Sequence, residues 1–171
     1  YDLFAFMAWG PGQQVFIMAG SEVWLLDPET REHEEFRFPE QEYGTSLLRA
    51  LATSADRTLL ADATVYGPTK SHPGSDIEIS VQPVTGGDRI SIAAFHLSDR
   101  VDMLPCGLSW APDGQRLALA LVVQSSTTAS IEGQLWLVGR SGTSPSMLAR
   151  GLFVEHPAVW SPDGRYVAFT R

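Results

Sequence analysis

The 171-residue sequence predicts an all-β fold built from a repeated four-stranded sheet. Three observations predict it. A motif with a tryptophan and a short polar turn recurs along the chain, β-branched and aromatic residues dominate the apolar runs, and no long window has the 3.6-residue periodicity of a helix. The repeat therefore sets the order of the strands.

The motif occurs four times, twice in closely matching form. The copies are residues 8–17 (AWGPGQQVFI), 52–61 (ATSADRTLLA), 108–119 (LSWAPDGQRLAL) and 158–169 (AVWSPDGRYVAF). They align without gaps on the tryptophan position, which holds Trp9, Thr53, Trp110 and Trp160. The spacings of 44, 57 and 50 residues suit four-stranded units that carry loop insertions.

Each motif is predicted to form the corner of a hairpin. In the last copy, Pro162 fixes φ at the second position of a type I turn, and Gly164 takes the position after Asp163. The tryptophans are expected to be buried between adjacent sheets, with an apolar residue seven positions later in an equivalent core position. These apolar residues are Phe16, Leu60, Leu117 and Val167. The structural residues of the repeat are Trp9, Trp110, Pro112, Asp113, Gly114, Trp160, Pro162, Asp163 and Gly164.

Apolar runs after each motif supply the remaining strands. Third strands are expected at residues 23–27, 77–81 and 135–138, and fourth strands at 34–38, 89–95 and 146–150. Such consecutive four-stranded units are typical of β-propeller blades. The blades lie at about 1–39, 47–96 and 105–150, and residues 156–171 supply a half blade. The sequence thus predicts about three and a half blades of a propeller with about six to eight, the rest coming from the same or another chain.

The motif itself resembles a known repeat. The Trp-Ser-Pro-Asp-Gly turn at residues 160–164, followed by Val-Ala-Phe, is similar to the repeat of TolB and of the propellers of tricorn and prolyl-oligopeptidase-type proteases. The first copy lacks the Asp-Gly pair, and the second lacks Trp, Pro and Gly. The resemblance implies a non-catalytic bacterial scaffold that binds another protein in the periplasm or outside the cell. The alternative it implies is the regulatory propeller of a serine peptidase whose catalytic domain lies outside this chain.

Composition excludes several functions. The net charge is −8 and no segment concentrates arginine or lysine, so no nucleic-acid partner is expected. No apolar stretch approaches the roughly 18 residues of a transmembrane helix, so direct membrane insertion is not expected. The single cysteine, Cys106, excludes an internal disulfide and a cysteine zinc cluster. No cofactor or metal is predicted.

Candidate binding residues gather on one predicted face. Turns after first and third strands are short, whereas the loops after second and fourth strands carry the insertions, and long loops on a rigid scaffold commonly bind partners. The candidates there are Tyr43, His72, His96, Asp99, Arg100, Asp102, Glu155 and His156. The structural alternatives are solvated histidines and, at residues 99–102, a turn with a local ion pair.

No catalytic motif is present. The sequence lacks a Gly-x-Ser-x-Gly elbow, a phosphate loop and a His-Glu-x-x-His pair. Ser109 lies in a near miss to the elbow, but Val159 takes its place in the last repeat, which indicates a structural position. Oligogalacturonate lyases are similar propellers with metal-binding histidines, to which His156 could be compared, but no further ligand matches. The sequence therefore predicts a protein that is not an enzyme.

Overall fold

The computed structural model describes residues 5–19, 22–38, 46–66, 76–96, 101–125, 128, 130–152 and 157–170. These residues form four antiparallel sheets and no helix, as the sequence predicts. The first sheet is β1 (Ala5–Trp9), β2 (Val15–Ala19), β3 (Glu22–Leu26) and β4 (His33–Glu35). The second is β5 (Ser46–Thr53), β6 (Leu59–Tyr66), β7 (Asp76–Pro83) and β8 (Ile90–His96). The third is β9 (Val101–Trp110), β10 (Arg116–Ser125), β11 (Ile131–Gly139) and β12 (Ser146–Leu152). The fourth is the hairpin β13 (Val159–Trp160) and β14 (Val167–Ala168).

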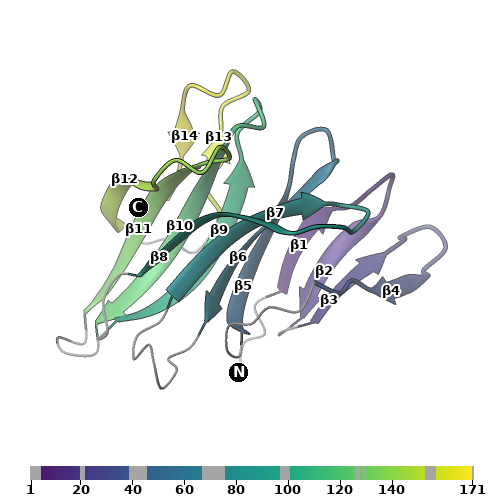
Figure 1. The fold of residues 1–171 in the computed structure, drawn as a ribbon, viewed down its shortest axis with the longest axis horizontal. Coiled ribbons are helices and arrows are strands. Elements are labelled where there is room, and N and C mark those ends of the chain that lie inside the picture. Colours follow the sequence, from purple (N-terminus) through teal and green to yellow (C-terminus); the bar gives the residue numbers. More distant parts are fainter. Residues whose placement is uncertain are drawn as a thin grey trace.

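The sheets fan out side by side in the order of the chain (Figure 1). Within each sheet, every strand pairs with its neighbours in sequence, so the sheets are simple meanders. The first strands of neighbouring sheets approach one another, β1 lying against β5 and β5 against β9. This radial arrangement, with two strands in the fourth sheet, confirms the architecture that the repeat predicts.

The Pro-Asp-Gly turns close the hairpins as expected. In the last repeat, Gly164 has φ 68° and donates its N–H to the carbonyl of Ser161. The carboxylate of Asp163 accepts the N–H of Arg165 at 3.1 Å. Gly114 and Asp113 repeat this geometry in the third sheet. These aspartates hold the turn through local hydrogen bonds to the backbone.

The second repeat keeps this turn without its glycine. Arg57 stands where the third and fourth copies have Gly114 and Gly164, and it adopts φ 57°, a left-handed conformation that costs a residue with a side chain about 1–2 kcal/mol. The carboxylate of Asp56 accepts hydrogen bonds from the N–H and hydroxyl of Thr58 and from the hydroxyl of Ser54. These bonds hold the turn in place of the lost proline and glycine.

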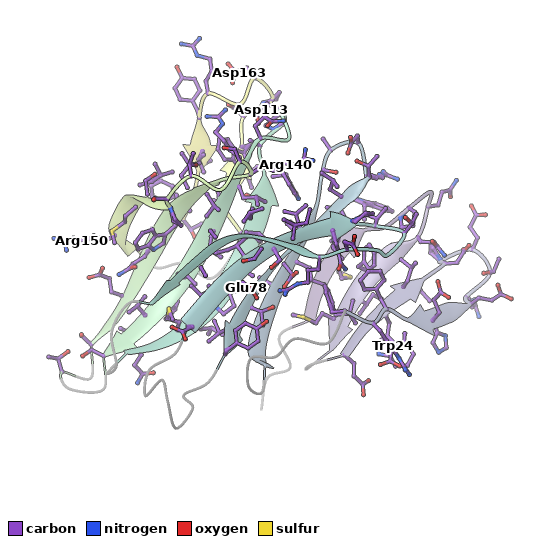
Figure 2. The ribbon with its side chains drawn as sticks, viewed as in Figure 1. Trp24, Glu78, Asp113, Arg140, Arg150 and Asp163 are labelled. Atoms are coloured by element: carbon purple, nitrogen blue, oxygen red, sulfur yellow. The ribbon has the colours of Figure 1, made fainter. Side chains whose placement is uncertain are left out.

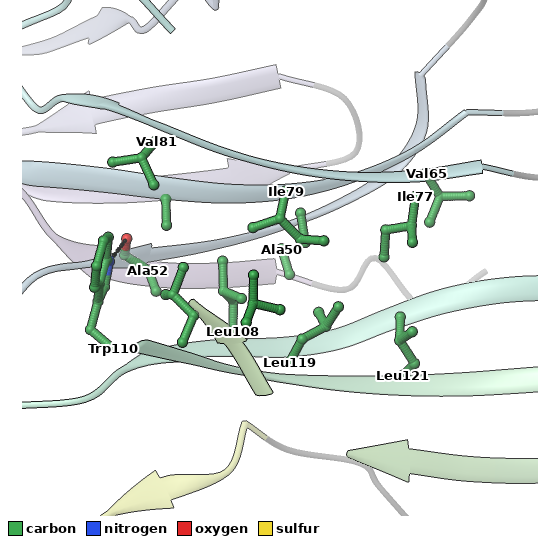
Figure 3. Close-up of a cluster of buried hydrophobic side chains, with 14 of the residues drawn as sticks. Ala50, Ala52, Val65, Ile77, Ile79, Val81, Leu108, Trp110, Leu119 and Leu121 are labelled. Atoms are coloured by element: carbon green, nitrogen blue, oxygen red, sulfur yellow. Dashed lines mark hydrogen bonds between the residues drawn. The ribbon is translucent and has the colours of Figure 1, made fainter. Parts of the chain in front are cut away.

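Apolar side chains fill the junctions between the sheets. The largest cluster joins the second and third sheets and includes Ile79, Leu119 and Trp110, which is 8% exposed (Figure 3). A second cluster, around Phe16 and Leu60, joins the first and second sheets. A third, smaller cluster joins β10 and β11 to the β13–β14 hairpin. The core is therefore divided between the sheet junctions rather than gathered in one centre.

In each of two junctions, a tryptophan forms a hydrogen bond to the preceding sheet. The indole Nε1–H of Trp110 donates to the carbonyl of Ala52 in the second sheet at 3.1 Å. The indole of Trp160 does the same to Ser109 in the third sheet at 3.2 Å. In both cases the acceptor is the residue just before the tryptophan position of the preceding repeat. Each tryptophan thus binds the backbone of the preceding sheet at the same position of the repeat.

The expected burial of Trp9 is wrong. Trp9 is 56% exposed, because no described residue covers the outer face of the first sheet. The guanidinium carbon of Arg57, from the second sheet, lies 5.0 Å from the centroid of its ring.

The predicted equivalence of Phe16 is wrong as well. Trp9 pairs with Val15, whereas Thr53, Trp110 and Trp160 pair with the residue seven positions later. The turn after Trp9 is therefore one residue shorter, and a slip of one residue turns every later side chain to the opposite face. Phe16 is fully buried, but it faces the second sheet, whereas Leu117 faces the sheet before its own.

Candidate functional site

The two ends of the sheets differ in construction. At the turn end, short hairpins at residues 10–14, 54–59, 111–116 and 161–166 are closed by backbone hydrogen bonds. At the opposite end, called here the loop end, β6 and β8 finish and β7 and β9 begin. This is the end at which the sequence predicts binding.

Two of the predicted binding residues lie on described strands at the loop end. His96 is the last residue of β8 and pairs with Asp76, the first residue of β7. Asp102 is the second residue of β9 and pairs with Gln124 on β10. The other six lie outside the described residues: Tyr43, His72, Asp99, Arg100, Glu155 and His156. The structure therefore places His96 and Asp102 on neighbouring sheets at one end, and the binding role remains a prediction.

A buried charged network crosses the second sheet, from Arg89, just before β8 at the turn end, to Tyr66 and Glu78 nearer the loop end, and it was not predicted from the sequence. The guanidinium of Arg89 donates to both carboxylate oxygens of Asp62, at 2.7 and 3.0 Å, and to Glu78 at 3.2 Å. The side chains of Arg89 and Asp62 are 4% and 0% exposed. The hydroxyl of Thr64 donates to Asp62, and that of Tyr66 donates to Glu78. Glu78 is labelled in Figure 2, on the second sheet.

The network lies on the side of the second sheet that faces the first. Leu60, on the same side of β6 as Asp62, packs in the cluster between these two sheets. The polar residues alternate along β6 and β7, with Asp62, Thr64 and Tyr66 on one strand and Glu78, Ser80 and Gln82 on the other. This alternation inside otherwise apolar strands is the one sequence signal that could have revealed the network.

Three polar atoms on this side have no hydrogen-bond partner among the described residues. They are the hydroxyl of Ser80 and both amide atoms of Gln82, and Gln82 is 2% exposed. A buried amide without a hydrogen-bond partner is costly, so these atoms stand out in this junction.

Burial and nearby charges both act on the pKa values of Tyr66 and Arg89. Burial raises the pKa of Tyr66, against the opposing effect of the Arg89 charge. Burial alone would lower the pKa of Arg89, but its hydrogen bond to Asp62 and the nearby charges raise it above its ordinary value. Tyr66 therefore stays a neutral donor and Arg89 stays a cation. The arrangement links β6, β7 and the residue before β8 through charged hydrogen bonds.

Other chemistry-bearing residues lie apart from one another. Ser109, on β9, has a buried hydroxyl without a hydrogen-bond partner in the described part of the chain. Burial raises the pKa of the Cys106 thiol on the same strand. Within the described ranges, no three histidine, cysteine, aspartate or glutamate side chains gather as a metal site would need. No helix among those residues is long and apolar enough to cross a membrane.

A groove also opens at the turn end of the first sheet. It has a volume of about 620 Å³ and is lined by Gln14, Leu25, Asp27, Arg31, Glu32, His33 and Glu34. The Asp27 carboxylate is engaged by the backbone N–H groups of Glu29 and Thr30, so it shapes the turn beneath the groove. This hollow lies opposite to the predicted binding end.

The arrangement of the sheets is shared with solved structures that contain β-propellers. Dipeptidyl peptidase 4 from Porphyromonas gingivalis aligns with 96% of this chain at a TM-score of 0.56 and 11% identity. The tricorn protease aligns with 99% of this chain at a TM-score of 0.53 and 10% identity. The sheets are propeller blades.

These likenesses concern the fold alone. The chain spans 29% of the length of the dipeptidyl peptidase chain and 15% of that of the tricorn protease. No protein-family model matches the sequence, and no curated protein matches it significantly. The chain is thus a run of propeller blades: the first is β1–β4, the second β5–β8, the third β9–β12, and the hairpin β13–β14 belongs to the fourth.

Proposed function

We propose that these blades are a non-catalytic scaffold that binds another protein at the loop end. The observation that carries the proposal is the contrast between the two ends. The turn end repeats one short hairpin whose aspartates bond to their own backbone. The loop end carries the insertions of the sequence, and the Arg89–Asp62 pair is buried within the sheet that bears two of them. Variable loops on a rigid support are the usual construction of a binding surface.

The resemblance of the Trp-Ser-Pro-Asp-Gly turn to the TolB repeat supports a scaffold that works in the periplasm or outside a bacterial cell. The partner is a protein rather than a nucleic acid, because the chain carries a net charge of −8 and phosphate binding needs clustered basic residues.

Capture experiments with matched variants test the proposal. The chain is immobilised, and proteins bound from an extract of the source cells are quantified by mass spectrometry. Joint replacement of His72, Arg100 and His156 by alanine is expected to reduce capture of the partner. The control replaces Gln13, Gln115 and Arg165, exposed residues at the turn end, and is expected to leave capture unchanged. Loss of capture in the control variant alone would refute binding at the loop end.

A regulatory propeller of a serine peptidase is the second candidate. The structural likeness to dipeptidyl peptidase 4 and to the tricorn protease favours it. Determining the coding sequence on both sides of these 171 residues tests this candidate. An α/β-hydrolase domain encoded in the same reading frame would replace the scaffold proposal with this one.

A further inference from the structure

The polar side chains of Ser80 and Gln82 point into the junction between the first and second blades. They are two residues apart on β7, so they lie on the same side of the strand. Leu60, which pairs with Gln82, packs in the apolar cluster that joins these two blades. Ser80 is 0% exposed and Gln82 is 2% exposed. Both side chains are therefore enclosed by blades that belong to this chain.

A second buried glutamine shows how the chain satisfies such a group elsewhere. Gln134, on the third strand of the third blade, is 9% exposed. Its amide nitrogen donates to Glu132 at 3.3 Å, and its amide oxygen accepts the indole N–H of Trp136 at 3.0 Å. Among the described residues, neither amide atom of Gln82 has such a partner. Because a buried amide without a partner is costly, Gln82 points to a bound ligand.

The charged network supplies further donors at the same place. Arg89 donates to Asp62, which pairs with Ser80 across the strands, and to Glu78, two residues from Ser80 along β7. The guanidinium therefore lies beside Ser80. A guanidinium has five N–H donors, and the bonds of Arg89 to described residues use three of them. The two others can donate to a ligand that also contacts Ser80.

The chemistry of the site selects water as the ligand. Arg89 already faces two carboxylates, those of Asp62 and Glu78, so the site does not attract an anion. Both carboxylate oxygens of Asp62 accept hydrogen bonds from Arg89, so they are not available to a metal ion. An amide and a hydroxyl each offer a donor and an acceptor, and water matches both.

The spacing of the two side chains also suits water. Two residues along a strand are about 7 Å apart, and a water that accepts or donates two hydrogen bonds of about 2.8 Å spans up to about 5.6 Å. The longer side chain of Gln82 can cover the remaining distance.

We propose that an ordered water molecule is bound between the first and second blades, where it bridges the hydroxyl of Ser80 and the amide of Gln82. Buried water of this kind typically makes about three hydrogen bonds, and the third comes from a free N–H of Arg89. The water links the polar side of β7 to the Arg89–Asp62 pair. It is independent of any partner bound at the loop end.

A crystal structure of the 171-residue chain, at a resolution that shows ordered water, tests the site directly. Density for a water within hydrogen-bond distance of both the Ser80 hydroxyl and the Gln82 amide is expected. A protein side chain in that position, or an amide surrounded only by apolar atoms, would overturn the proposal.

Thermal unfolding of matched variants tests it in solution. Gln82→Met removes a ligand of the water and is expected to lower the thermal midpoint by about 2–4 °C, as the loss of one hydrogen bond does in a chain of this size. Gln134→Met, which removes direct bonds to protein groups, is the control and should lower it at least as much. A midpoint that is unchanged or raised in Gln82→Met would overturn the proposal, because replacing an amide without a partner costs nothing.

A double variant tests whether the two residues share the water. Ser80→Ala alone is expected to lower the midpoint by about 2–4 °C. Because either substitution weakens the same water, Ser80→Ala combined with Gln82→Met should lower the midpoint by less than the sum of the two single losses. Losses that add fully would show that no bridging water joins Ser80 and Gln82. Circular dichroism confirms that each variant is folded.

Discussion

The indole of Trp110 and the backbone carbonyl of Ala52 join two blades through a hydrogen bond of 3.1 Å. Trp110 thereby fixes the third blade to the first strand of the second, while its ring fills the largest apolar cluster of the chain. One side chain thus combines apolar burial with a positional bond between sheets that are distant in sequence.

Truncation of Trp110 should destabilise the chain strongly. Trp110→Ala is expected to lower the free energy of unfolding by about 3–5 kcal/mol, because it leaves a cavity between two blades. Trp110→Phe keeps most of the ring and loses the bond to Ala52, so a loss of about 1 kcal/mol from that bond is expected in addition to a smaller packing loss. Urea unfolding monitored by circular dichroism measures both. Equal losses in the two variants would show that the cavity does not matter.

Gly107 sets the approach of the fourth blade. A Cβ atom at this position would lie 2.5 Å from the Cα of Pro157. Gly107→Ala is therefore expected to cost about 1–3 kcal/mol and to expose β13 and β14 to hydrogen exchange. Gly114→Ala is the matched control: its Cβ would meet nothing within 4 Å, and only the left-handed φ of 65° opposes it. The control should cost about 1 kcal/mol without loosening the hairpin. Protection of β13 and β14 that is equal in both variants would contradict this account.

Removing one partner of the Arg89–Asp62 pair should lower the free energy of unfolding more than replacing both partners by apolar residues. Arg89→Met alone leaves a fully buried carboxylate without its cation and is expected to cost about 3–5 kcal/mol. Asp62→Leu combined with Arg89→Met removes both charges of the pair and is expected to recover part of that loss, because Glu78 still loses its bond to Arg89. Chemical denaturation of the single and double variants measures the difference. A double variant as unstable as the single one would show that the pair itself stabilises the blade.

Acid should loosen the motif turns. The backbone N–H of Gln115 is the largest influence that lowers the pKa of Asp113, and the hydroxyl of Ser161 is the largest that lowers that of Asp163. Because both pKa values are lower in the folded chain than in the unfolded one, the stabilisation is present at neutral pH and is lost as the pH falls through the folded values. Asp113→Asn and Asp163→Asn should therefore flatten the acid side of the stability profile. Thermal midpoints measured from neutral to acid pH test this, and an unchanged acid side in both variants would contradict it.

The sequence was sufficient where a residue acts through its own neighbours in the chain. Pro112, Asp113 and Gly114 determine a local turn, so their roles could be read directly. The face of Phe16 could not be read, because Gly10-Pro11-Gly12 resembles the motif closely enough to hide a turn that is one residue shorter.

Contacts between distant segments were beyond the sequence argument. The Arg89–Asp62 pair joins residues 27 positions apart, and only the folded sheet brings them together. The exposure of Trp9 depends on what covers its blade, which the motif does not encode. The predicted binding residues show the same limit, since strand parity assigned His96 and Asp102 to one end but does not give the chemistry they meet there.

Arg57 shows how a copy of the repeat that has lost its motif residues can form a new contact between blades. Glycine at this corner has no side chain, whereas Arg57 extends from the same backbone conformation to the carbonyl of Gly12 and to the ring of Trp9 in the neighbouring blade. The turn thus has a less favourable backbone conformation, but its side chain now joins the first and second blades. The second blade has Thr53 at the position where the third and fourth blades have the tryptophan that bonds to the preceding blade. Divergence of a duplicated unit can therefore move a bond from one residue to another while the architecture stays the same, and a search based on the intact motif alone would count two units in a chain that contains four.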